Sequence, residues 1–317
     1  MPLLAIDLGG TKLAFAVFSQ KGDLLCEEKI NLNKRKGAEV GRLISETLAA
    51  NLATQKDKGE EIEAIGISVP GIYHKNEGTV WAPNIEGWEN YHLLKEIGSV
   101  AGNIPVIIDS DRACYVLGEW WMGMAQNCSD AIFLAVGTGI GAGILTGGKI
   151  LRGANDIAGA IGWMALERPF QHDYKDTGCF ESSATGQGIA EMAKKIISEK
   201  KEYDGLLKTK SLNTLTALDV FEAYEKEDAV AEEVLRHCIE LWGMAVANLI
   251  SLFNPQKIIF GGGVFGPAVK FIPDIKMEAV KWAQPVSMQH VTIETSALGT
   301  RAGLYGAACM ARKNFKM

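Results

Sequence analysis

The sequence lacks three features that would each define a class of protein. Its six cysteines are scattered and none lies within four residues of another, so their spacing shows no zinc knuckle or redox pair. No window approaches the ~18 consecutive apolar residues of a membrane-spanning helix. The net charge is −6, from 32 Lys and Arg against 38 Asp and Glu, so no overall positive field exists for nucleic acid or anionic membrane. We therefore expect reduced core cysteines and neither nucleic acid nor membrane as a partner.

Length and composition indicate a soluble globular protein with more than one domain. The 317 residues exceed the ~250 at which single cores tend to split into domains. The hydrophobic fraction is 47% and the charged fraction 22%, which is ordinary for globular proteins. The beginning, MPLLAIDLGGTK, enters an apolar strand at once and has no basic segment followed by a long apolar stretch. This favours a cytoplasmic location.

Alternation and helical spacing of apolar residues predict a mixed α/β chain. The predicted strands lie at 3–6, 13–17, 24–30, 62–69, 106–108, 131–136, 140–145, 150–151, 257–260 and 291–294. The predicted helices lie at 38–55, from about 112, at 182–200, 216–253, 267–283 and 299–312, with a break in the fourth near Glu227 and Asp228. The strand–turn–strand–turn–strand pattern at the beginning of the chain returns from residue 131. We infer a duplicated architecture.

Glycine is abundant, with 35 residues, and it gathers where predicted strands end. Three clusters occur, at Asp7 to Lys12, at Gly137 to Gly143 and at Gly261 to Gly263. Without a Cβ atom, a turn at a strand end lets backbone N–H groups approach an anion closely. Tight hairpins alone would explain one such cluster, but three at strand ends favour phosphate binding. None has the spacing of a Walker loop or of a dinucleotide-binding fingerprint.

Several motifs together resemble the ROK family of bacterial sugar kinases and repressors. They are DLGGTK at 7–12, SVPG at 68–71, APN at 82–84, VGTGIGAGI at 136–144, NPQKIIFGGGV at 254–264 and LGTRAGLYGAA at 298–308. The resemblance covers essentially the whole chain, in order. It implies the hexokinase/actin-like (ribonuclease H-like) fold, with two duplicated α/β domains around a cleft that binds nucleotide and sugar. We place the small N-terminal domain at 1–113 plus 300–317, and the large domain at 114–299.

The resemblance implies ATP with Mg²⁺ as cofactor, and it assigns phosphate-binding roles to the three turns. The implied nucleotide- and phosphate-binding residues are Asp7, Gly9, Gly10, Thr11, Lys12, Gly137, Thr138, Gly139, Gly261, Gly262 and Gly263. A strand-borne Asp beside a phosphate loop suits magnesium held through water, so we expect Mg²⁺ near Asp7. Lys12 could neutralise the transferred phosphate or could be an ordinary solvated turn residue.

Asp111 matches the general base of the family, which accepts the proton of the sugar hydroxyl during phosphoryl transfer. From the sequence alone, a cap for the following helix is an alternative role for this residue. Asp109 is the nearby competitor, at a position that the family does not use as a base. The resemblance implies six sugar-binding residues, which are Pro70, Gly71, Asn84, Ser110, Asp111 and Glu181. Trp88 could line the pocket or belong to the core.

The chain departs from the family pattern around the implied sugar site. Ala160 stands where the family has a sugar-binding Glu, and Trp163 stands where it has a zinc-binding His. Ser110 replaces an Asn, and two cysteines of the zinc cluster are absent. His172 and Cys179 cannot complete a tetrahedral site, so we expect no structural zinc. A small Ala160 and an apolar Trp163 could admit a bulkier or glycosidic sugar.

The leading hypothesis is an ATP-dependent sugar kinase, an ATP:hexose phosphotransferase, with Asp111 as the general base. The expected acceptor is the 6-hydroxyl of a hexose or hexose derivative, with glucose, N-acetylmannosamine and β-glucosides as candidates. The alternative is a non-catalytic sugar-sensing regulator without a DNA-binding domain, because the first strand at residue 3 leaves no room for a preceding winged helix. A nucleotide-binding structural protein similar to actin is a third hypothesis. The resemblance also implies a homodimer.

Overall fold

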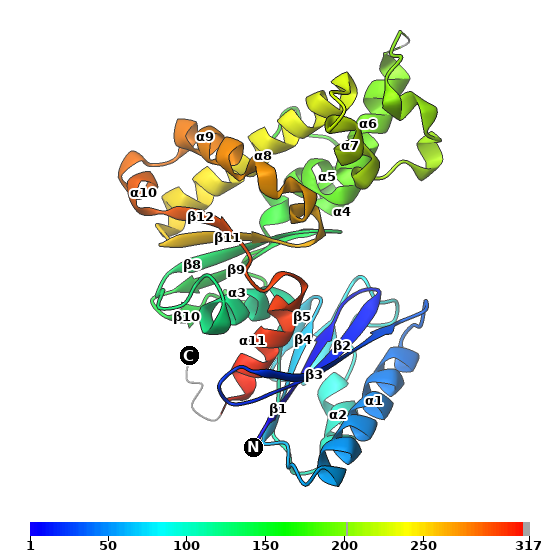
Figure 1. Cartoon of the computed structure of the whole chain (residues 1–317), viewed down its shortest axis with the longest axis vertical. Helices are drawn as coiled ribbons and strands as arrows, with labels where there is room; N and C mark the ends of the chain where they lie inside the picture. The colour runs from blue at the N-terminus through cyan, green and yellow to red at the C-terminus, as the bar shows by residue number, and fades with distance from the viewer. Residues whose placement is uncertain (201, 313–317) are drawn as a thin grey trace. The chain divides into compact units, whose positions relative to one another are not determined.

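The computed structural model describes residues 1–200 and 202–312, and these form two α/β units (Figure 1). Unit 1 comprises Met1–Asn127, Gly143–Ala158 and Ala297–Met317, and unit 2 comprises Cys128–Ala142 and Gly159–Ser296. The domain boundaries expected from the sequence, 1–113 plus 300–317 and 114–299, stay a prediction, and residues 313–317 lie outside the described part. All six cysteines are free and five of them are buried.

The sheet of unit 1 has five strands whose apolar residues alternate or run continuously through the core. They are β1 (Leu3–Leu8), β2 (Lys12–Phe18), β3 (Leu24–Asn31), β4 (Ala64–Val69) and β7 (Val106–Ser110). Their order is β3-β2-β1-β4-β7. β2 runs antiparallel to β1 and to β3, whereas β1, β4 and β7 are parallel. The carboxyl ends of these three parallel strands therefore meet at one edge of the sheet.

The helices of unit 1 include two, α3 and α11, that pack closely against each other, and α11 also packs on the central strands of that sheet. The elements are α1 (Ala38–Asp57), α2 (Leu93–Ala101), α3 (Asp111–Met122), α11 (Ala302–Ala311) and the short hairpin β5 (Ile72–His74) and β6 (Thr79–Trp81). Helix α11 contacts α3, β1 and β4, although almost 200 residues separate α11 from α3. The main core of the unit joins α1 and α2 to the sheet through residues such as Ile6, Ile44 and Ile97.

A second five-stranded sheet repeats the strand order of the first. Its strands are β8 (Ala131–Val136), β9 (Ile140–Thr146), β10 (Lys149–Ile150), β11 (Lys257–Gly261) and β12 (Thr292–Thr295). Their order is β10-β9-β8-β11-β12, and β8, β11 and β12 are parallel. The unit boundary falls within β9, after Ala142. The duplication that the sequence predicts is confirmed, because each sheet pairs two hairpin-linked strands with three parallel ones.

Helices make up most of the rest of unit 2. They are α4 (Tyr174–Thr177), α5 (Cys179–Ala184), α6 (Gly186–Glu199), α7 (Ala217–Tyr224), α8 (Ala229–Phe253), α9 (Ile272–Trp282) and α10 (Pro285–His290). The longest, α8, packs against α9 and α6 (Figure 1). It buries an apolar face that includes Leu241, Trp242 and Leu249. Within the described part of the chain, no helix is both long and apolar enough to span a membrane.

The predicted elements differ from the structure mainly where a polar residue ends a helix. The predicted helix at 182–200 is two helices, because Thr185 is extended and its side chain accepts a hydrogen bond from Gly188 N–H as the cap of α6. The break predicted near Asp228 is confirmed, since Asp228 caps α8. The sequence interpretation missed α2, α10 and the β5–β6 hairpin.

Candidate functional site

Two carboxylates lie at the carboxyl edge of the sheet in unit 1. Asp7 is the residue before the last in strand β1, and Asp111 begins α3 directly after β7. Burial raises the pKa of Asp7 to about 6. Burial also raises the pKa of Asp111 to about 6, where the charge of Arg112 opposes the rise and that of Asp7 adds to it. The two acids are therefore electrostatically coupled, and each holds a proton more tightly than an exposed Asp.

The cap of helix α3 is Ser110, which leaves Asp111 for another role. Ser110 is extended, and its hydroxyl accepts a hydrogen bond from Ala113 N–H at 3.4 Å. One Asp111 oxygen accepts from Arg112 N–H at 2.7 Å, and the other accepts from the Tyr115 hydroxyl at 3.4 Å. The capping role considered for Asp111 from the sequence thus belongs to Ser110. The Ser110 hydroxyl is thus hydrogen-bonded to the first turn of α3. The sugar-binding role expected of Ser110 stays a prediction.

Asp109, the competing acid, is held by an ion pair. Arg152 Nη1 lies 2.6 Å from one carboxylate oxygen of Asp109 and 2.5 Å from the other. Asp109 also accepts a hydrogen bond from Ser110 N–H at 2.8 Å, and it is buried. Both oxygens of the Asp109 carboxylate therefore lie within ion-pair distance of a guanidinium nitrogen. Asp111, in contrast, accepts hydrogen bonds from a backbone amide and a hydroxyl group.

Helix α11 contributes to this site through a glycine that the sequence interpretation did not single out. A Cβ atom on Gly303 would lie 2.5 Å from a carboxylate oxygen of Asp7. A Cβ atom on Gly306, one turn later, would lie 1.8 Å from the carbonyl oxygen of Cys114 in α3. The signal in the sequence was the run of small residues at 298–308. Its function is to let a helix backbone approach Asp7 and α3 closely.

The first glycine turn lies beside Asn84. Gly9 N–H donates to the Lys12 carbonyl at 2.8 Å and closes the turn. A Cβ atom on Gly10 would lie 3.2 Å from the Cβ atom of Asn84. Gly10, Thr11, Lys12 and Asn84 are all exposed. The structure therefore brings a predicted phosphate-binding turn next to a predicted sugar-binding residue within unit 1.

The Pro70–Gly71 turn follows β4 and begins the β5–β6 hairpin. A Cβ atom on Gly71 would lie 2.0 Å from the carbonyl oxygen of Trp81, so only glycine allows this close approach. Trp88, which follows the hairpin, is fully buried and stacks on Tyr91 with ring centroids 4.4 Å apart. The core role considered for Trp88 is confirmed.

The two glycine turns of unit 2 lie together. Gly137 N–H donates to Gly139, and the Gly137 carbonyl accepts from Gly186 N–H at 3.1 Å. Gly262 has a φ of 90°, and a Cβ atom there would lie 2.3 Å from the Val136 carbonyl oxygen. Because β8 and β11 are parallel neighbours, their turns share one edge of the sheet. Gly263 has open space around it, so no packing contact explains why a glycine stands there.

Glu181, on α5, lies against the turn at 137–139. Its carboxylate accepts a hydrogen bond from Ile140 N–H at 2.7 Å. Burial raises the pKa of Glu181, and the hydrogen bond from Ile140 partly opposes this rise. The side chain predicted to contact sugar therefore contacts the backbone that follows the phosphate turn. Its contact with a sugar stays a prediction.

The segment that carries Ala160 and Trp163 does not fit a tetrahedral zinc site. Trp163 is 54% exposed, and its indole cannot ligate a metal. Among residues 1–200 and 202–312, no group of three or more His, Cys, Asp or Glu side chains is arranged to hold a metal ion. Tetrahedral structural sites need four such donors.

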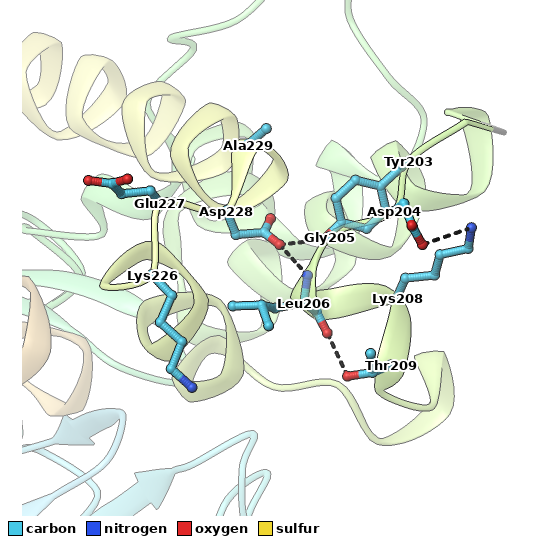
Figure 2. Close-up of a pocket in the computed structure, with 10 residues that line it drawn as sticks. All are labelled: Tyr203, Asp204, Gly205, Leu206, Lys208, Thr209, Lys226, Glu227, Asp228 and Ala229. Atoms are coloured by element: carbon cyan, nitrogen blue, oxygen red, sulfur yellow. Dashed lines mark hydrogen bonds and ion pairs between the residues drawn. The ribbon is translucent and has the colours of Figure 1, made fainter.

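A surface pocket of about 550 Å³ lies elsewhere in unit 2, between the 203–209 loop and the beginning of α8 (Figure 2). Its buried acid, Asp228, accepts hydrogen bonds from the Tyr203 hydroxyl and Leu206 N–H as well as from the first turn of α8. These bonds use the carboxylate to hold the loop. None of the residues that line this pocket was predicted to bind a ligand.

Two α/β units with one strand order, and with glycine turns at the carboxyl edges of the sheets, define the actin-like ATPase fold. The chain matches the ROK family model over residues 3–314, and it belongs to the ROK family.

Similar proteins of known name include both kinases and a repressor. A glucokinase from Halalkalibacterium halodurans is 31% identical over 98% of this chain and 94% of its own. A xylose repressor from Caldicellulosiruptor bescii is 29% identical over 97% of this chain and 77% of its own. Among solved structures, a ROK family glucokinase from Streptomyces griseus in complex with glucose and AMPPNP is 28% identical, with a TM-score of 0.78, over 99% of this chain and 100% of that one.

Proposed function

We propose that this protein is a sugar kinase that transfers the terminal phosphoryl group of ATP to a sugar hydroxyl, with Asp111 as the general base. The observation that carries the proposal is the difference between the two acids at the carboxyl end of β7, Asp109 in the strand and Asp111 directly after it. Asp109 is bound by Arg152, whereas Asp111 lies beside Asp7 with a pKa of about 6. The glucokinase relative and the glucose–AMPPNP complex of a similar chain support the reaction class.

The raised pKa of Asp111 suits a group that must accept a proton near neutral pH. At pH 7 a carboxyl group with a pKa of about 6 is mostly ionised, yet it is a stronger base than an exposed Asp. Asp111 takes the proton of the attacking hydroxyl as that oxygen bonds to phosphorus and the bond to the leaving ADP oxygen breaks. Proton acceptance of this kind contributes about 10²–10⁴ in rate.

The glycine turns bind the phosphates in this proposal. In unit 1 the turn at 9–12 offers backbone N–H groups and Lys12. In unit 2 the turn at 137–139 offers backbone groups and the Thr138 hydroxyl, and the turn at 261–263 offers backbone alone. Mg²⁺ commonly binds through one or two carboxylates plus substrate phosphates, and Asp7 fits this role. When bound, the ion neutralises charge on the phosphates.

The acceptor is a hexose or a hexose derivative, phosphorylated at its 6-hydroxyl. Asn84 and the Pro70–Gly71 turn contact its hydroxyl groups, since an amide offers both a donor and an acceptor. Because Ala160 cannot supply the hydrogen bonds of a Glu, and because Ala160 is small and Trp163 apolar, the pocket accepts a larger or glycosidic sugar. Glucose, N-acetylmannosamine and a β-glucoside are the acceptors to test. The homodimer and the cytoplasmic location stay predictions.

The test is ADP production from ATP against a panel of these sugars, with Asp111→Asn as the diagnostic variant. We expect one sugar to support turnover and the Asn variant to lose at least 100-fold in kcat, because its amide cannot accept the proton. Asp57→Asn, at an exposed position in α1, is the matched control and should keep full activity. Full activity of Asp111→Asn would refute the assignment of the base.

A non-catalytic sugar-binding regulator is the second candidate. The altered residues Ser110, Ala160 and Trp163 favour it, as does the repressor among the similar proteins. Calorimetry separates the two functions. Sugar binding without ADP production from any sugar of the panel would support the regulator.

A further inference from the structure

Helix α5 lies between the phosphate-binding turn of unit 2 and the long helix α8. It carries Glu181 near its beginning and Ser183 near its end. Glu181 contacts the turn, and Ser183 contacts a cluster of polar side chains that ends on α8. The helix is only six residues long, so its position depends on these contacts more than on its own hydrogen bonds.

The contact between Glu181 and the turn is built into the surrounding backbone. A Cβ atom on Gly139 would lie 3.1 Å from a carboxylate oxygen of Glu181, and one on Gly162 would lie 2.6 Å from the same oxygen. Both glycines therefore make room for the carboxylate that accepts the hydrogen bond from Ile140 N–H. A charged acceptor bonded to a backbone amide is a strong contact, worth more than a neutral hydrogen bond.

The other end of α5 is fixed to α8 by buried donors. The Trp242 indole N–H donates to the Ala184 carbonyl at 3.2 Å, and the Cys238 thiol donates to the Ser183 carbonyl at 3.7 Å. Trp242 and Cys238 are both fully buried. These bonds satisfy carbonyl groups that the end of a short helix leaves without partners.

Glu167 adds a charged connection to the same end. One of its carboxylate oxygens lies 2.9 Å from His237 Nε2 on α8. The other accepts from the Ser183 hydroxyl, and from the Tyr174 hydroxyl at 3.5 Å. A single side chain from the 164–173 segment thus joins α4, α5 and α8. We call Glu167, His237, Ser183 and Tyr174 the Glu167 cluster.

We propose that Glu181 is a positioning residue for the phosphate-binding turn at 137–139, and that the Glu167 cluster holds α5 so that Glu181 keeps its contact with Ile140. The cluster does this with hydrogen bonds, in a segment whose residues do not fit a zinc site. The inference rests on the proposed function, because it assigns phosphate binding to the turn. It differs from the expected role of Glu181, since a sugar contact would leave nucleotide affinity without sugar unchanged.

The first test measures ADP affinity by calorimetry in the absence of sugar. We expect Glu181→Ala to weaken ADP binding about tenfold, the effect of losing a hydrogen bond to a charged group. Glu181→Gln should stay within about threefold of wild type, because the amide oxygen can still accept from Ile140 N–H. Glu191→Ala, at an exposed position in α6, is the matched control for loss of a carboxylate and should change nothing.

The second test follows the Ile140 amide by hydrogen exchange without any ligand. Exchange should accelerate in Glu181→Ala and, to a smaller extent, in Glu167→Ala, and it should stay at the wild-type rate in Glu181→Gln. Glu167→Ala should also weaken ADP binding, by about threefold, since it loosens α5 and leaves the bond to Ile140 in place. This variant keeps the inference testable if Glu181→Ala does not fold.

The outcomes separate this inference from the proposed function. Wild-type ADP affinity and wild-type exchange at Ile140 in a folded Glu181→Ala would overturn the inference and leave the kinase proposal standing. A wild-type protein that binds no ADP would overturn both. Loss of ADP affinity in Glu181→Ala with rescue by Glu181→Gln would support the positioning role, even if no sugar of the panel is phosphorylated.

Discussion

The two units share a strand order but differ in the charged residues that they carry. In unit 1 the carboxyl edge of the sheet holds two acids, Asp7 and Asp111. Burial raises the pKa of each to about 6, and the charge of Asp7 adds to the rise at Asp111. In unit 2 the corresponding edge holds glycine turns, and a partly exposed pair of opposite charges, Glu167 with His237, joins the helices behind them. The fold is the same, so the chemistry of each unit comes from a few residues at the strand ends.

The units also differ in how their central helices are held. In unit 1, α11 packs on α3 and β4 through glycines, with backbone against backbone at Gly66, Gly118 and Gly306. In unit 2, α8 packs through large side chains, as in the contact of Trp242 with Phe265, whose ring centroids lie 5.1 Å apart. Close backbone packing leaves little room for a changed side chain, whereas side-chain packing can adjust. We therefore expect unit 1 to be the less tolerant of small additions.

The largest expected effect comes from adding one methyl group to α11. In Gly306→Ala the new Cβ atom would lie 1.8 Å from the Cys114 carbonyl oxygen, which cannot move without shifting α3. We expect the free energy of unfolding to fall by about 3 kcal/mol or more, measured by urea denaturation. Gly98→Ala is the matched control, because that position in α2 has open space and a helical backbone. It should stabilise by about 0.5–1 kcal/mol. Equal stability of the two variants would contradict the comparison.

A smaller effect of opposite sign is expected at Asp111. A carboxyl group whose folded-state pKa is raised from 3.8 to about 6 costs stability when ionised, so the cost is present above pH 6 and disappears as the pH falls below 3.8. Asp111→Asn removes this charge. We expect the free energy of unfolding of the nucleotide-free protein to rise by about 1–2 kcal/mol at pH 7.

The pH dependence of that gain is the decisive measurement at Asp111. The gain should shrink from pH 6 to pH 4, as Asp111 itself takes up a proton in the wild-type protein. Asp57→Asn should show no gain at either pH. If Asp111→Asn were less stable than wild type at pH 7, the ionised Asp111 carboxylate would not be destabilising the folded protein, and this comparison of the units would be wrong.

The smallest effect is expected in the Glu167 cluster. The hydrogen bond to Glu167 raises the pKa of His237 above 6.5, with burial opposing and the charges of Glu167 and Glu240 adding. Burial would raise the pKa of Glu167, but bonds from His237 and Ser183 outweigh it and lower the value below 4.5. The attraction is therefore full between about pH 4.5 and 6.5, and it is lost as the pH rises through the raised pKa of His237.

His237→Gln tests this attraction. We expect it to lower the free energy of unfolding by about 0.5–1 kcal/mol at pH 5.5 and by less at pH 8, since the pair is partly exposed. Urea denaturation at the two pH values measures the difference. His290→Gln, on exposed α10, is the matched control and should show the same stability as wild type at both. If the free energy of unfolding fell by the same amount at both pH values, His237 would stabilise the fold by packing and not by its charge.

Much of the fold could be predicted from the sequence, because alternation and helical periodicity are local. The strands at the beginning of the chain and from residue 131 were predicted in type and order, and their repetition predicted the duplication. The missed elements, such as α2 and the β5–β6 hairpin, are short, with nine residues in α2 and three in each hairpin strand. Leu93, Ile97 and Ala101 do repeat at helical spacing in α2, so this helix was detectable from the sequence. The break at Thr185 was missed because a cap is a local hydrogen bond inside an otherwise continuous helical pattern.

The candidate site could be predicted in composition but not in its contacts. Asp7, Asp111 and the glycine turns stand out as residue types at strand ends. Nothing in the sequence separates Asp109 from Asp111 physically, since the ion pair with Arg152 joins residues 43 positions apart. Gly303 was overlooked for the same reason, because its partner Asp7 lies at the other end of the chain.

The order of residues along the chain therefore determined the two repeated α/β patterns, the glycine turns and the acids available for chemistry. These depend on interactions between near neighbours, which a sequence displays directly. Tertiary structure alone decided that Ser110 caps α3, that Arg152 binds Asp109 and that Glu181 bonds to Ile140. The pKa values of Asp7 and Asp111 also follow from it, because burial and distance between charges exist only once distant segments have packed together.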